Sequence, residues 1–253
     1  MSDKGQAAEL LSLDILPPGL EPLDAGRVLG AGTTGDLDVE VDVEVDVEVD
    51  VEVDVEADVE VDDEVNLLIT ATWTVAARTG SFEPSVREIL QEAGVSTKAF
   101  YRHFRSKDDL LLVALETASL QLVDYIESKM APVDDPARRV RVWLESFMRQ
   151  AIVPSAARRT LPWALGVGQL AHRYPDQFDH SKALVIAPLE REITEAVARG
   201  TAMSPNPARD ARIIFGYTMD AIRHHLIRRT EPDRSDTEQL VDFTYRALGI
   251  STD

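Results

Sequence analysis

Two spacings of apolar residues divide this chain into two parts. From about residue 66 to the C-terminal end, apolar side chains recur every three or four positions, which is the spacing of one face of an α-helix. In residues 36–64, valine alternates with aspartate or glutamate almost without interruption, which is the period of a β-strand. Because no strand pattern follows residue 65, we expect an all-α protein preceded by an acidic repeat.

Residues 1–64 form an acidic arm of low sequence complexity. They carry 21 acidic and two basic side chains, which accounts for the whole formal net charge of −19 and leaves the remaining chain neutral. Carboxylates on alternate residues of a strand lie about 7 Å apart, within a Debye length of about 8 Å, so they repel one another. We therefore expect the arm to be disordered, with a strand that pairs with another chain as the alternative. Calcium binding by these carboxylates would be weak, since the arm lacks the glycine and the ligand spacing of a calcium loop.

The arm is followed by the signals of three helices. The first is expected at 66–78 from its apolar face. Ser85 starts the second helix, because its hydroxyl and the Glu88 carboxylate three residues later can form a capping box, and Gly94 ends it. Ser96 then caps the third helix through its hydroxyl.

The third helix has an apolar inner face and a cationic outer face. A helix of about two turns with positive charge, preceded by a glycine-containing turn, has the shape and chemistry to enter the DNA major groove. Between Ala93 and Lys107 there is no acidic residue, so phosphate oxygens would meet no opposing carboxylate. The alternative is a solvated surface helix with ordinary basic residues. The basic residues are Lys98, Arg102, Arg105 and Lys107.

Four segments carry a resemblance to a known family. They are SVREI at 85–89, AGVS at 93–96, FYRHF at 100–104 and SK at 106–107. In residue types and spacing, this stretch resembles the DNA-binding domain of the tetracycline-repressor (TetR) family of bacterial transcriptional regulators. The resemblance implies a ligand-responsive repressor that binds a palindromic operator in double-stranded DNA as a homodimer and is released by a small-molecule effector.

The resemblance and the helical pattern together imply three parts. These are a disordered acidic arm at 1–64, a helix-turn-helix DNA-binding domain at 65–112, and an all-helical ligand-binding and dimerisation domain at 113–253. Prolines punctuate the last part and favour helix starts. We expect its helices at 107–129, 136–152, 155–161, 162–173, 175–199, 207–229 and 235–248.

We expect the DNA contacts to come from the second and third helices and from the start of the fourth. Thr97, Lys98 and His103 would face base edges or the adjacent phosphates, whereas Tyr101 and Lys107 would hold the DNA backbone. The predicted DNA-binding residues are Ser85, Arg87, Ser96, Thr97, Lys98, Ala99, Tyr101, Arg102, His103 and Lys107.

An effector pocket would need aromatic and apolar side chains that converge inside the helical body. Such residues more often belong to the hydrophobic core and contact no ligand. Gly166 is unusual within a helix, since glycine costs about 1 kcal/mol against alanine, and it suggests a close helix approach or a local opening. The predicted ligand-binding residues are Trp143, Phe147, Trp163, Gly166, Phe178, Phe215 and Met219.

The last two helices carry more apolar residues than one buried face needs. We expect them to pair with the same helices of a second copy in a four-helix bundle, which is the arrangement that the resemblance implies. The apolar residues that these helices offer to the interface are Ile213, Ile214, Phe215, Tyr217, Ile222, Leu226, Ile227, Leu240, Val241, Phe243 and Leu248, and charged substitutions of Phe215 and Ile222 are expected to give monomers.

No catalytic or metal site is indicated. The chain has no cysteine, and it lacks Gly-x-Ser-x-Gly, His-Glu-x-x-His and glycine-rich phosphate motifs, so we expect no enzyme activity, cofactor or metal. No signal peptide and no apolar run of about 18 residues is present, so we expect a cytoplasmic protein without a membrane partner. Two alternatives remain: an acidic-arm interaction protein with a helical scaffold, or a DNA-binding protein without a small effector.

Overall fold

The computed structural model describes residues 55–230, 232 and 234–251. The predicted disorder of residues 1–54 lies outside the described residues. The described part is helical throughout, as expected, and contains no strand. Its helices are α3 (Val55–Thr79), α4 (Val86–Ala93), α5 (Thr97–His103), α6 (Lys107–Met130), α7 (Pro136–Ile152), α8 (Pro154–Arg173), α9 (Pro175–Ala198), α10 (Pro207–Arg228) and α11 (Arg234–Ala247).

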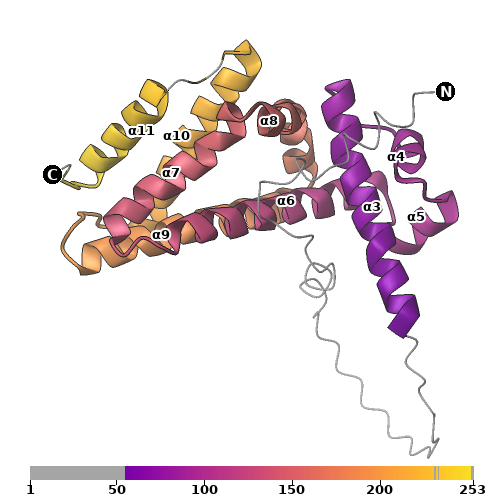
Figure 1. The fold of residues 1–253 in the computed structure, drawn as a ribbon, viewed down its shortest axis with the longest axis horizontal. Helices are drawn as coiled ribbons and strands as arrows, with labels where there is room; N and C mark the ends of the chain where they lie inside the picture. The colour runs from indigo at the N-terminus through magenta and orange to yellow at the C-terminus, as the bar shows by residue number, and fades with distance from the viewer. Residues whose placement is uncertain (1–54, 231, 233, 252–253) are drawn as a thin grey trace, which may run out of the picture.

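The helices form a head and an elongated body (Figure 1). The head consists of α3, α4 and α5, and α6 leads from it into the body. In the body, α9 packs along both α6 and α7, and α10 packs on α7, α8 and α9. None of the described helices is long and apolar enough to cross a membrane.

Helix α3 begins earlier than the sequence predicts. It starts at Val55 rather than near residue 66, so residues 55–64 of the predicted disordered arm belong to a helix. The alternating pattern pointed to a strand or disorder, but extending an existing helix by one residue is far easier than starting one. The buried residues Val65 and Leu68 anchor the helix in the core of the head.

The capping signals of the head are confirmed. The Ser85 side chain accepts a hydrogen bond from the Glu88 amide at 3.2 Å, and the Glu88 carboxylate accepts one from the Ser85 amide at 2.9 Å. Gly94 ends α4 with φ of 69°, a left-handed conformation that glycine adopts without strain. These caps orient α4 and α5 so that Ile89 and Phe100 are fully buried together.

Helix α8 is one helix where two were predicted. It continues through Pro162, although proline removes one backbone hydrogen bond and normally breaks or kinks a helix. Pro162, Trp163 and Leu170 are all buried, and this packing outweighs the local preference. The prolines that open α7, α9 and α10 stand in their first turns, as predicted.

Helix α8 also joins the body to the head. Trp163 and Leu170 belong to the same buried cluster as the core of the head. Gly166 lies against Phe82, and a Cβ at position 166 would come within 2.1 Å of the Cβ of Phe82. The close approach expected of this glycine therefore occurs between the body and the head.

Candidate DNA-binding helix and small-molecule cavity

The outer face of α5 presents polar and cationic side chains. Thr97, Lys98 and Arg102 are exposed, and Tyr101 is 61% exposed. Ser96 caps the helix, its hydroxyl accepting a hydrogen bond from the Ala99 amide at 3.1 Å. The arrangement offers hydrogen-bond donors and positive charge on one exposed surface, which suits contact with base edges and phosphates.

Two predicted DNA contacts do not lie on this face. Ala99 is buried, and the His103 side chain is only 7% exposed. His103 Nε2 lies 2.7 Å from Glu64 Oε2, and Arg102 Nη1 lies 3.4 Å from the same oxygen. Sequence reasoning missed Glu64 as a partner because it placed that residue in a disordered arm. Ala99 and His103 are one turn apart, on the side of α5 that also buries Phe100.

The remaining predicted contacts flank α5. Ser85, the N-cap of α4, and Arg87 within α4 are exposed, and the Ser85 hydroxyl donates to the Glu88 carboxylate at 2.6 Å. Lys107 is the first residue of α6, and its Nζ lies 3.5 Å from a Glu83 carboxylate oxygen.

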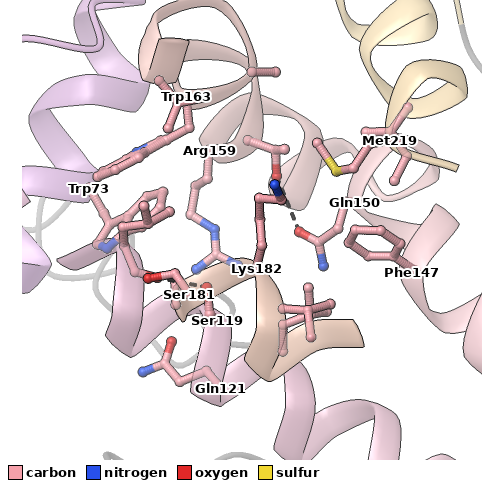
Figure 2. Close-up of a pocket in the computed structure, with 18 of the residues that line it drawn as sticks. Trp73, Ser119, Gln121, Phe147, Gln150, Arg159, Trp163, Ser181, Lys182 and Met219 are labelled. Atoms are coloured by element: carbon pink, nitrogen blue, oxygen red, sulfur yellow. Dashed lines mark hydrogen bonds between the residues drawn. The ribbon is translucent and has the colours of Figure 1, made fainter. Parts of the chain in front are cut away.

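A cavity of about 260 Å³ lies where the head meets the body. Residues of α3, α6, α7, α8, α9 and α10 line it, and Figure 2 shows their side chains converging. On one side, Trp73 of α3 stacks on Trp163 of α8 with ring centroids 4.3 Å apart. On the other side, Phe147 of α7 stacks on Phe215 of α10 at 5.5 Å. An aromatic pair therefore lines the cavity on each of two sides.

Most of the predicted ligand-binding residues line this cavity. Trp143 and Gly166 do not: Trp143 is fully buried in the core and donates its Nε1 hydrogen to the Val185 carbonyl at 3.2 Å, while Gly166 faces Phe82. The predicted residues that line the cavity are Phe147, Trp163, Phe178, Phe215 and Met219.

Sequence reasoning missed the polar lining and the contribution of the head. One signal was available: Arg159 and Thr160 precede Trp163 and Ala164 by one helical turn and so share their face of α8. No local signal identified Trp73, because its position depends on how the head docks on the body. The missed residues include Thr70, Trp73, Ser119, Gln121, Gln150, Arg159, Thr160, Ser181 and Lys182.

The electrostatics of the cavity are cationic. Two basic residues and no carboxylate are among its lining residues. Lys182 Nζ is paired with Asp179 at 2.9 Å, and Gln150 accepts a hydrogen bond from Thr160 at 3.1 Å. Arg159 makes no hydrogen bond or ion pair within the described part of the chain, and its burial lowers the pKa of its guanidinium.

Comparison with known proteins agrees with this geometry. Residues 68–114 match the family described as "Bacterial regulatory proteins, tetR family". The HTH-type transcriptional regulator BetI of Yersinia pestis (strain Pestoides F) is 30% identical over 95 residues, which are 37% of this chain and 48% of that protein. The chain therefore spans about half the length of the curated relative that it matches.

Two solved structures share the fold. FadR from Bacillus subtilis, in complex with stearoyl-CoA, has a TM-score of 0.61 at 17% identity, covering 70% of this chain and 96% of that chain. RolR, in complex with resorcinol, has a TM-score of 0.57 at 18% identity, covering 76% of this chain and 90% of that chain.

The capped helix pair α4 and α5 lies within the matched residues 68–114 and has a helix-turn-helix arrangement. Over these residues, the chain is similar to the tetR family of bacterial regulatory proteins.

Proposed function

We propose that this protein is a repressor that binds a palindromic DNA operator as a homodimer and releases it when a small molecule enters the cavity. The observation that carries this proposal is the position of α3. Its Trp73 lines the cavity and stacks on Trp163, and its Glu64 contacts the recognition helix α5. One helix thus contacts both the proposed effector site and the proposed DNA-binding helix.

The exposed face of α5 supports the DNA-binding part of the proposal. Thr97 and Lys98 lie at the N-terminal end of α5, where a recognition helix contacts base edges. We assign Tyr101, Arg102 and Lys107 to phosphate contacts, because the first two are exposed on α5 and Lys107 is partly exposed at the start of α6.

An exposed apolar patch supports the dimer. Ile213 and Tyr217 stand one turn apart on α10 and are 59% and 45% exposed. Phe243 of α11 is 47% exposed and contacts Tyr217 with ring centroids 5.0 Å apart. Contiguous exposed aromatic and aliphatic side chains are typical of a surface that another chain covers.

The expected interface residues Phe215 and Ile222 lie elsewhere. Phe215 lines the cavity, and Ile222 is fully buried in the core. The dimer proposal therefore rests on Ile213, Tyr217 and Phe243.

Genome-wide footprinting of the tagged protein tests the proposed function. We expect protected palindromes whose two halves are spaced for the two heads of a dimer. Lys98→Ala should change the preferred base at one position of each half of the palindrome. Lys107→Ala should weaken binding to all DNA sequences alike and reduce the slope of log affinity against log salt concentration by about one. Lys129→Ala, an exposed lysine at the other end of α6, is the matched control and should leave both unchanged. Absence of any protected sequence would refute the proposal.

A further inference from the structure

Arg159 is the cationic group of the cavity that lacks a partner. Figure 2 shows its side chain reaching from α8 into the cavity, with the guanidinium directed toward Ser119 and Ser181. It forms no ion pair or hydrogen bond with any described residue. Arginine keeps its charge under all ordinary conditions, so a guanidinium stands in a mostly apolar space without a counter-charge.

No described residue that lines the cavity can neutralise this charge. The lining residues include no aspartate or glutamate, and the other cation, Lys182, is paired with Asp179 and lies 5.4 Å from the centroid of the Phe178 ring. A partly buried charge without a partner destabilises a folded protein, unless a bound group supplies the missing partner. The ligand that fits this feature carries one negative group.

The rest of the cavity is shaped for an apolar body. The Trp73–Trp163 pair and the Phe147–Phe215 pair stand on opposite sides of it. Its volume of about 260 Å³ is slightly below the usual range of about 300 to 1,000 Å³ for ligand pockets, so the ligand is compact.

We propose that the cavity binds a small amphipathic carboxylic acid. Its carboxylate accepts two parallel hydrogen bonds from the Arg159 guanidinium, and its ring or short chain lies between the aromatic pairs. A carboxylate matches one unpaired guanidinium better than a doubly charged phosphate, which would need further free donors. The inference names the effector class of the proposed function and rests on the cavity being the effector site.

Isothermal titration calorimetry of the full chain without DNA tests the charge requirement. The probes are phenylacetate and octanoate, their neutral amides phenylacetamide and octanamide, and inorganic phosphate. We expect at least one acid to bind at least tenfold more tightly than its own amide, and phosphate alone to show no binding. An amide that binds as tightly as its acid, or no binding of either acid, overturns the proposal.

Variants at two neighbouring arginines locate the charge. Arg159→Met should weaken binding of the acid at least tenfold and leave the amide unchanged, and Arg159→Lys should give an intermediate affinity, since lysine keeps the charge without the bidentate geometry. Arg158→Met, at an exposed position, should bind the acid as the wild type does. Unchanged acid affinity in Arg159→Met overturns the proposal.

The melting temperature separates a ligand-binding role from a structural one. Without ligand, Arg159→Met should melt at the same or a higher temperature than the wild type, because it removes an unpaired charge. A large drop would mean that Arg159 supports the fold and would overturn the proposal. Footprinting distinguishes the two proposals. If the protein protects its operator but binds no acid, only the proposed ligand class is wrong. If it protects no DNA, the proposed function is wrong.

Discussion

Trp73 of α3 stacks on Trp163 of α8 with ring centroids 4.3 Å apart, and both rings line the cavity. Trp73 belongs to the helix that braces the DNA-binding head, whereas Trp163 belongs to the body. A molecule that enters the cavity therefore meets both parts of the protein at once. A change in this stack would shift α3 and, through it, the contacts of α3 with α4 and α5.

We expect Trp73→Leu to uncouple the cavity from the head. Operator affinity without ligand should stay within about twofold of wild type, but the ligand-induced loss of affinity should shrink at least fivefold, which lies within usual allosteric coupling energies. Fluorescence anisotropy of labelled operator with and without ligand measures both quantities. Leu67→Ala, at a half-exposed position of the same helix, is the control and should keep full coupling. Full coupling in Trp73→Leu would show that α3 does not transmit the signal.

Glu64 is expected to weaken binding to random DNA. Its carboxylate lies 3.4 Å from Arg102 Nη1 and 2.7 Å from His103 Nε2, so it offsets positive charge on the recognition helix. Glu64→Gln should raise affinity for random DNA about two- to fivefold at low salt, and the gain should fade as salt screens the charges. Filter binding across a salt series measures this change.

Two controls separate Glu64 from other carboxylates. Glu92→Gln removes an ion pair with Arg78 that involves no residue of α5, and it should leave DNA affinity unchanged. Deleting residues 1–54 keeps α3 whole and tests the rest of the acidic arm separately. If Glu64→Gln and Glu92→Gln behave alike, the contact with Arg102 has no role in DNA binding.

The patch of Ile213, Tyr217 and Phe243 is expected to hold the dimer together. The double variant Ile213→Glu, Phe243→Glu should sediment as a monomer and protect no operator. The two substitutions place charge in a surface from which the dimer excludes water. Leu165→Glu is the matched control, since Leu165 is 57% exposed on α8, and it should sediment as wild type. A double variant that still sediments as a dimer would place the interface elsewhere.

The capping box of α4 makes stability depend on pH. The Glu88 carboxylate accepts hydrogen bonds from the Ser85 hydroxyl and amide, and these bonds hold its pKa below the ordinary value of 4.5. A carboxylate with a lowered pKa stabilises the folded state fully above pH 4.5, and this contribution is lost as the pH falls through the lowered pKa.

We expect Ser85→Ala to lower the melting temperature by several degrees at pH 7 and by less near pH 3. Glu88→Gln has no titratable group at this position but can still bond the cap amide. Its melting temperature should therefore fall by less at pH 7, and it should equal that of the wild type at low pH. Thermal unfolding followed by circular dichroism between pH 3 and pH 7 measures both. A constant difference between wild type and Ser85→Ala across this range would contradict the assignment.

The helix caps of the head could be predicted from the amino-acid sequence alone. Helix α4 begins at the Ser85–Glu88 capping box and ends at Gly94, and α5 begins after Ser96. Each of these caps is a hydrogen bond or a backbone conformation that involves only a few neighbouring residues. The prolines at the starts of α7, α9 and α10 act equally locally. Short-range chemistry of this kind can be read without knowing which helices pack together.

Which residues form the cavity and which lie at the surface depends on how the helices pack against one another. Ile213, Ile214 and Phe215 are consecutive apolar residues of α10, yet one is exposed, one is buried in the core and one lines the cavity. That division depends on the rotation of α10 against α7, α8 and α9. The pairing of Glu64 with His103 joins residues 39 positions apart and required α3 to extend across α5. The Arg159 side chain faces the cavity without a partner among the described residues, in a space that side chains of six helices line, and no local sequence pattern predicts such an arrangement.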